Sequence, residues 1–237
     1  DSWFFITDDY AFGHSLERDA SAVITKNGGK VIGSVRPPFA TPDLSSFVLQ
    51  AQASKAKIIG IAGGPPNNTT AIKTGGEFGV FKGGQQMAAL LALITDIHGL
   101  GLPVAQGLLL TTSFYWDMDD KTREWSKRYF AKMNRMPTMW QAGVYSSVIN
   151  YLNAIKESGT DDPLKVAAKM REKPVEDFFA RNGKLREDNL MVHDLWLVQV
   201  KKPEESKYPW DYYKILTKIS GDDAFGPPDP ACPLVKK

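Results

Sequence analysis

Cysteine and histidine are scarce in this 237-residue sequence, which has one cysteine, Cys232, and three histidines, His14, His98 and His193. A single cysteine excludes an internal disulfide framework and a cysteine-based metal cluster. The histidines lie far apart in the sequence, and no two of them have the helical or turn spacing of a metal site. We therefore expect no metal and no cofactor.

Long apolar runs and an excess of one charge are missing as well. No stretch of the sequence approaches the length of a transmembrane helix. Lysine and arginine number 29 against 27 aspartates and glutamates, a formal net charge of +2 with no long basic block, so the charge does not predict nucleic acid as a partner. With 43% hydrophobic and 24% charged residues, the composition is that of a globular protein with a substantial core.

The usual motifs of catalysis and nucleotide binding are also absent. The sequence has no G-x-S-x-G elbow and no P-loop. The glycine-rich stretch 60–64 is not a G-x-G-x-x-G dinucleotide loop, and Pro65-Pro66 would disrupt the helix start that such a loop needs. The acidic pairs Asp8-Asp9 and Asp119-Asp120 are more typical of solvated caps than of acid and base catalysis. The sequence therefore has no motif that would supply the nucleophile of an enzyme.

What the sequence does have is an alternation of strand-like and helix-like segments over its first half. The apolar run 3–6 stops in a polar and aromatic turn, and a helical pattern then runs from Leu16 to Asn27-Gly28-Gly29. Similar patterns predict strands at 30–35, 57–61, 80–81 and 107–113, and helices that begin at Thr41 as the cap, after the loop 62–70, and at Met87. Five such units without a hairpin signal predict an α/β fold with a doubly wound parallel sheet.

The alternation stops at about residue 119. The patterns that follow predict helices at 121–132, 139–157 and 162–172, a hairpin turn at Asn182-Gly183, a strand at 193–200 and a surface-hugging tail from Gly221 onward. The sequence starts with Asp1 rather than Met and opens directly on a strand. We therefore expect a processed or truncated chain.

Polar amides and aromatic rings gather on the loops that follow the predicted strands. In open α/β sheets, ligands bind beyond the carboxyl ends of the strands. A few amides inside an aromatic box can recognise a small molecule without reacting with it. The candidates for such a pocket are Tyr10, Phe12, Asn67, Asn68, Gln85, Gln86, Phe114, Tyr115 and Trp116. The alternative for each residue is core packing or helix capping.

One series of segments follows an order and spacing known from a protein family: WFFITDDYAFGHSL, TPDLSSFVLQAQASKAKIIGIAGG, VFKGGQQ, VAQGLLLTTSFYW, PTMWQAGVYSSVINYLNAI and NGKLRE. From residue 1 to about 200 the chain resembles the second lobe of the periplasmic solute-binding proteins of ABC importers, the type I periplasmic binding proteins. It most resembles the branched-chain amino acid binding type. The segment 203–237 resembles an extension that some members of the family carry.

The resemblance implies two α/β lobes that are joined by three crossovers and close on a ligand. It assigns residues 1–117 to the second, ligand-binding lobe, 118–174 to helices that pack on a missing first lobe, 175–202 to a hairpin that returns to the second lobe, and 203–237 to the extension. It also implies export to the periplasm, with the leader not present in this chain. The implied partners are a small-molecule ligand, an ABC permease of the inner membrane and the missing N-terminal lobe.

The resemblance also carries an expectation about the ligand. The family's aromatic contact in the first loop falls on Phe12, and the carboxylate with which amino-acid binders hold the ligand's α-ammonium is replaced by Gln85. A buried ammonium without a partner costs roughly 3 to 5 kcal/mol, which disfavours a free amino acid. Phe12, Trp116 and Trp140 add flat apolar surface, which suits an aromatic or otherwise planar carboxylate.

The sequence thus predicts a solute-binding receptor that delivers a small organic ligand to an ABC importer and has no chemistry of its own. The alternative is a ligand-sensing receptor or regulatory domain of the same fold, and an enzyme is third. The fold alone does not separate these functions.

Overall fold

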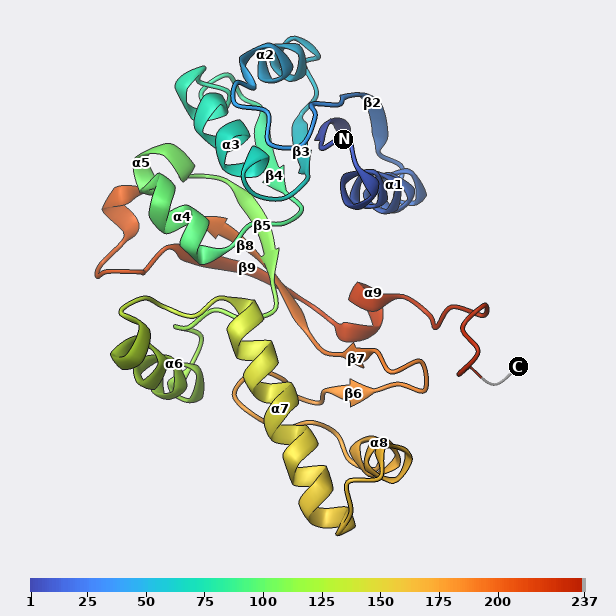
Figure 1. Cartoon of the computed structure of the whole chain (residues 1–237). Helices are drawn as coiled ribbons and strands as arrows, with labels where there is room; N and C mark the ends of the chain where they lie inside the picture. Colours follow the sequence, from blue (N-terminus) through green and yellow to red (C-terminus); the bar gives the residue numbers. More distant parts are fainter. Residues whose placement is uncertain (236–237) are drawn as a thin grey trace. The chain divides into compact units, whose positions relative to one another are not determined.

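The computed structural model of the chain describes residues 1–235 (Figure 1). The chain forms two compact units. The first unit holds Asp1–Thr111 and Val198–Ile215, and the second holds Thr112–Leu197 and the chain from Leu216 on. The chain passes from one unit to the other three times, and each passage falls within a strand.

A seven-stranded, mostly parallel sheet organises the fold, in the order β2-β1-β3-β4-β5-β8-β9. Its strands are β1 (Ser2–Thr7), β2 (Lys30–Val35), β3 (Ile58–Ala62), β4 (Gln86–Ala89), β5 (Leu109–Thr112), β8 (Leu195–Val200) and β9 (Tyr213–Ile219). The neighbouring pairs among β1 to β5 are all parallel, as the alternation in the sequence predicts. The strand order reverses between β1 and β3, because β1 pairs with β2 on one side and with β3 on the other.

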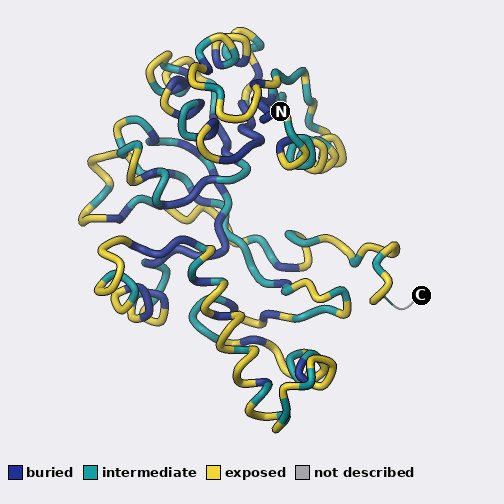
Figure 2. Tube along the Cα trace, in the orientation of Figure 1, coloured by how far each residue is buried: buried dark blue, intermediate teal, exposed yellow. Residues whose placement is uncertain are grey.

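The helices of the first unit connect these strands. They are α1 (Ala11–Lys26), α2 (Ser45–Ala53), α3 (Asn67–Glu77), α4 (Ile94–Leu100), α5 (Leu102–Ala105) and the short 3-10 helix η1 (Pro203–Glu205). The core between sheet and helices contains the fully buried side chains of Phe5, Val48, Ile59, Ile72 and Met87. Figure 2 shows β3 and β4 as buried, while the outer turns of α1 and α2 are exposed. Val48 and Ala51 of α2 and Ala71 and Ile72 of α3 are buried, the pattern expected of amphipathic helices that cover a sheet.

The second unit is mainly helical. It contains α6 (Asp120–Met133), α7 (Met139–Ser158), α8 (Pro163–Arg171), the two-stranded antiparallel sheet of β6 (Lys184–Leu185) and β7 (Met191–Val192), and α9 (Gly221–Phe225). Side-chain caps set the starts of the three long helices: the side chains of Asp119, Thr138 and Asp162 each accept a hydrogen bond from a backbone N–H of the first turn. Trp125 stacks on Phe178 with ring centroids 4.4 Å apart at the centre of an aromatic core.

The prediction for the fourth strand was wrong. Val80 and Phe81, the expected strand, lie in a turn. The fourth strand is Gln86–Ala89, where the sequence predicted the start of a helix at Met87. The run from Met87 to Ile94 consists only of Met, Ala, Leu and Ile. A short apolar run of this kind fits a buried strand and a buried helix equally well, so the pattern alone does not distinguish them.

Several local predictions also need correction. The helix expected at Thr41 begins at Ser45, whose N–H is bound by the Asp43 side chain at 2.8 Å. Asn182-Gly183 does not form the expected hairpin turn: Gly183 pairs with Val175, and the turn of the hairpin between β6 and β7 lies at residues 186–190. The strand β9 was not predicted, since proline and lysine in the preceding segment obscure its pattern. The helix expected at Met87 begins only at Ile94, and the helix expected after the loop 62–70 begins within that loop, at Asn67. The remaining predicted strands and helices are confirmed with small shifts at their ends.

Among the described residues, no helix is both long and apolar enough to span a lipid bilayer.

Candidate functional site

The loops after β1, β2 and β3 leave the sheet at the same edge, because the three strands are parallel and adjacent. The strand order β2-β1-β3-β4-β5 reverses between β1 and β3. In doubly wound sheets such a reversal opens a crevice beyond the carboxyl ends of the strands, where ligands bind. The candidate site therefore begins with the residues that follow Thr7 and Ala62.

Asp8, the first residue after β1, is buried with 2% of its surface exposed. Its Oδ2 accepts a hydrogen bond from the Gly64 N–H at 3.1 Å, and its Oδ1 accepts one from Asn67 Nδ2 at 2.7 Å. A Cβ at Gly63 would lie 2.4 Å from the Asp8 carboxyl group, so only glycine fits there. One carboxylate thus ties the end of β1 to the whole loop between β3 and α3.

The loop after β2 is tied to the same group. Asn67 Nδ2 donates a second hydrogen bond to the Pro38 carbonyl at 2.9 Å, and the Asp9 N–H donates to the Pro37 carbonyl at 2.9 Å. The Thr41 hydroxyl donates to the Pro38 carbonyl at 2.6 Å. The backbones of three strand-end loops are therefore locked together.

An aromatic cluster, defined here as Tyr10, Phe12 and Phe39, stands on these locked loops. Tyr10 lies 6.1 Å from Phe12 and 5.4 Å from Phe39 between ring centroids, the second pair edge to face. Phe12 is 41% and Phe39 56% exposed. Partial burial, and after it the charge of Asp8, raise the pKa of the Tyr10 phenol above its ordinary value.

The loop after β4 continues this surface with apolar side chains. Leu90 and Leu91 follow the strand and are partly exposed. Asn68 Nδ2 holds the loop by donating to the Gly63 carbonyl at 2.9 Å and to the Leu91 carbonyl at 2.6 Å. The described residues at the carboxyl ends of β1 to β4 thus present rings and leucines.

The carboxylates near these strand ends already have partners. Both oxygens of buried Asp8 accept the hydrogen bonds described above, and Asp9 pairs with His14 at 2.8 Å. Asp96 Oδ2 accepts the Leu93 N–H at 2.9 Å, and burial raises the pKa of the Asp96 carboxyl above its ordinary value. The surface therefore offers a ligand apolar contact and no unpaired carboxylate from these three residues.

The structure brings four of the predicted site residues together in the first unit: Tyr10, Phe12, Asn67 and Asn68. Asn67 and Asn68 are each 2% exposed, and their N–H groups bind loop carbonyls and Asp8. The two amides therefore hold the loops, and their direct contact with a ligand stays a prediction. Sequence reasoning missed Phe39, Leu90 and Leu91, although each follows a strand.

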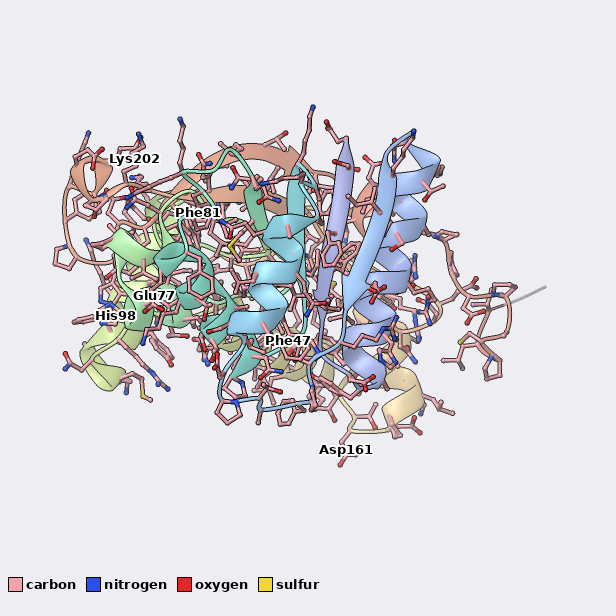
Figure 3. All side chains as sticks on the ribbon, turned by 90° about the horizontal axis from the view of Figure 1, so that it is seen from above. Phe47, Glu77, Phe81, His98, Asp161 and Lys202 are labelled. Carbon is pink, nitrogen blue, oxygen red and sulfur yellow. The ribbon has the colours of Figure 1, made fainter. Side chains whose placement is uncertain are left out.

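The expectation that Gln85 follows the fourth strand was wrong. Gln85 precedes β4 and so lies at the amino edge of the sheet, where its Nε2 donates to the Ala56 carbonyl at 2.9 Å. It lines a separate cavity of about 440 Å³, whose lining also includes Phe81 and Lys202, labelled in Figure 3. We therefore leave Gln85 out of the proposed ligand site.

This placement predicts that Gln85→Glu leaves ligand preference unchanged. The variant lowers the free energy of unfolding by about 1 to 2 kcal/mol, because a carboxylate replaces the donor that faces the Ala56 carbonyl. Urea denaturation and ligand titration test this. The control is Gln50→Glu, where the exposed amide donates within its own helix to Ser46 at 3.2 Å. A shift of preference from 3-phenylpropanoate toward phenylalanine in Gln85→Glu would contradict the placement.

Phe114, Trp116 and Trp140 belong to the second unit. Phe114 is 3% exposed and packs edge to face on Trp125, 5.8 Å away between ring centroids. Trp116 is buried and Trp140 is 50% exposed in the first turn of α7. Phe114 therefore serves the core of this unit, and a ligand contact by any of the three stays a prediction.

The second unit carries an exposed apolar helix face. Val144, Val148 and Leu152 follow one another at helical spacing along α7 and are 63%, 49% and 51% exposed. Tyr151 extends the same stripe. Figure 2 shows α7 exposed over much of its length. An apolar stripe of this kind on a helix normally faces a partner.

Comparisons with known proteins identify the family of most of the chain. A family described as "Periplasmic binding protein" matches residues 1–207. No curated protein matches the chain.

Among the residues that the structure describes, no group of His, Cys, Asp and Glu could hold a metal ion.

The chain is similar to several crystal structures. A periplasmic binding protein from Burkholderia mallei is 48% identical, with a TM-score of 0.92 over 100% of this chain and 63% of its own. A branched chain amino acid ABC transporter periplasmic ligand-binding protein from Burkholderia xenovorans is 41% identical, with a TM-score of 0.89 over 96% of this chain and 61% of its own. A solute binding protein of an ABC transporter from Rhodopseudomonas palustris, in complex with 3,4-dihydroxy benzoic acid, shares the fold at 17% identity, with a TM-score of 0.79 over 93% and 61%. The chain thus spans less than two thirds of the length of these relatives.

Proposed function

Because the chain belongs to the periplasmic binding protein family, we propose that the protein is the periplasmic solute-binding receptor of an ABC importer. It binds a small organic ligand and presents it to the permease in the inner membrane. The strand-order reversal and the hydrogen-bonded loops beyond it support this proposal, because ligands of doubly wound sheets bind at such a reversal.

We further propose an aromatic or planar carboxylate as the ligand, in preference to a free amino acid. The observation that carries this proposal is the apolar surface at the carboxyl ends of β1 to β4, where rings and leucines stand and the nearby carboxylates already have partners. An α-ammonium group buried there would lose its hydration, and the buried carboxylate of Asp8 already uses both oxygens within the protein, so we expect a cost of roughly 3 to 5 kcal/mol. A flat apolar ring loses little by leaving water and gains contact with the aromatic cluster.

The second unit supports a two-lobed receptor. The relatives are longer than this chain, and α7 exposes an apolar stripe of Val144, Val148 and Leu152. We propose that residues 118–174 pack on a first lobe that lies outside this chain. The ligand then lies between the lobes, and closure of the lobes around it is the signal that the permease reads.

A ligand panel tests the proposed function. The protein expressed from its complete gene is titrated by calorimetry with 3-phenylpropanoate, 3,4-dihydroxybenzoate, phenylalanine and leucine. We expect at least one aromatic acid to bind at least about a hundredfold more tightly than phenylalanine, because a buried unpaired ammonium costs several kcal/mol. The relative from Burkholderia xenovorans is named for branched-chain amino acids, so leucine is the informative competitor. Tight binding of leucine without binding of the aromatic acids would overturn the ligand class and leave the receptor assignment standing.

A further inference from the structure

Phe39 is the most exposed ring of the aromatic cluster, with 56% of its surface accessible. Single exposed apolar residues are ordinary on protein surfaces. Phe39 is not single, because its ring meets Tyr10 edge to face at 5.4 Å and Tyr10 in turn meets Phe12 at 6.1 Å. The three rings form a continuous apolar surface that remains open to solvent.

The backbone beneath Phe39 is held far more firmly than its exposure suggests. Pro37 and Pro38 precede it and fix their own φ angles. The carbonyl of Pro37 accepts the Asp9 N–H, and that of Pro38 accepts both Asn67 Nδ2 and the Thr41 hydroxyl. Ala40, which follows, has a φ of +57°, a conformation that only surrounding contacts maintain in a residue with a Cβ.

A ring that is exposed yet mounted on a fixed backbone suits recognition. The loop that carries Phe39 is already ordered on folding. Binding of a ligand to Phe39 therefore has no further entropic cost of ordering this loop. The same loop bonds explain why the ring stays open, because they hold the backbone at the strand ends and prevent the loop from folding the ring into the core. Because Phe39 is 56% exposed, packing of the core does not need its ring, which is available for contact with a ligand.

We propose that Phe39 is a specificity-determining contact for a planar aromatic ligand, and that the Asp8–Asn67 pair positions it through the Pro38 carbonyl. This inference rests on the proposed function and adds a residue and a positioning group to it. Asp8 touches no ligand in this arrangement, since it is buried and both of its oxygens are bonded within the protein. Its effect passes through Asn67 to the loop that carries Phe39.

The first test replaces the ring. In the protein expressed from its complete gene, Phe39→Ala weakens binding of 3-phenylpropanoate about tenfold, the loss expected for one aromatic contact. Phe39→Trp retains tight binding, because it keeps a flat ring. The control is Phe78→Ala, which removes another partly exposed phenylalanine of the first unit, at the end of α3, and leaves the affinity unchanged. The unfolding temperature without ligand stays the same in Phe39→Ala, so folding does not confound the result.

The second test separates positioning from general damage by a double-mutant cycle. Asn67→Ala weakens 3-phenylpropanoate binding in the wild-type background, and the loss disappears when Phe39 is already alanine. In the Phe78→Ala background the loss from Asn67→Ala stays undiminished. A merely structural role of Asn67 would give the same loss in all backgrounds, and this result would overturn the positioning part of the proposal.

The outcomes also separate this inference from the proposed function. Equal 3-phenylpropanoate affinity of wild type and Phe39→Ala overturns the role of Phe39 and leaves the receptor function intact. Binding of leucine alone, with no aromatic acid bound, overturns the proposed ligand class and this inference with it. An affinity loss in Phe39→Ala that Phe39→Trp restores supports both.

Discussion

The 237-residue chain on its own is expected to bind 3-phenylpropanoate at least about a hundredfold more weakly than the protein expressed from its complete gene. In the proposed receptor, half of the ligand's contacts come from the other lobe, and losing a few kcal/mol of contact reduces the affinity by this factor. The fold of the first unit does not depend on the ligand, because its core is buried within the unit itself. Calorimetric titration of both proteins measures the difference, and equal affinity would place the pocket wholly within this chain.

The same chain is expected to self-associate through the apolar stripe of α7. Exposed Val144, Val148 and Leu152 provide a surface that water disfavours. The double variant Val144→Glu and Val148→Glu reduces association, whereas Val23→Glu does not, although Val23 is 61% exposed on α1. Light scattering coupled to size-exclusion chromatography reads out the mass. A strictly monomeric wild-type chain would count against a stripe that requires a partner.

Asp8→Ala is expected to cause the largest loss of stability among single substitutions at the site. The substitution leaves the buried Gly64 N–H without its acceptor. It also removes one of the two acceptors of Asn67 Nδ2. Each lost hydrogen bond to a charged group costs roughly 1.5 to 3 kcal/mol. We therefore expect a decrease of about 3 to 6 kcal/mol in the free energy of unfolding.

The matched control for this substitution is the neighbouring residue. Asp9 is exposed and pairs with exposed His14, and surface pairs of this kind contribute less than about 1 kcal/mol. Urea denaturation of Asp8→Ala and Asp9→Ala, followed by circular dichroism, gives both values. Similar midpoints for the two variants would show that the Asp8 bonds do not hold the loops.

Elements with long and regular patterns were predictable from the sequence alone. The helices α1, α6 and α7 carry apolar residues at helical spacing with recognisable ends, and the strands β1, β2 and β3 are bounded by turn residues. The fourth strand was not predictable, because the run from Met87 to Ile94 has no polar residue to reveal its period. Because the fourth strand was predicted too early in the chain, Gln85 was predicted at the carboxyl edge of the sheet, whereas it lies at the amino edge.

The residues of the candidate site also differ in how far the sequence alone could predict them. Tyr10 and Phe12 could be predicted, since they follow the first strand directly in the sequence. Phe39 could not, because its relation to Tyr10 depends on β2 pairing beside β1 and on Asn67 binding the Pro38 carbonyl from a different loop. Neither the pairing nor the hydrogen bond leaves a local pattern.

The sequence by itself determined the α/β class, the parallel sheet and the resemblance to solute-binding proteins, because these follow from periodic patterns within short stretches of chain. Only the tertiary structure decided which loops meet. The order β2-β1-β3 brings the ends of three strands to one edge, and the buried Asp8 carboxylate joins residues up to 59 positions apart in the chain. Contacts between distant segments depend on how the strands are ordered, and the strand order is a property of the folded sheet that no single segment encodes.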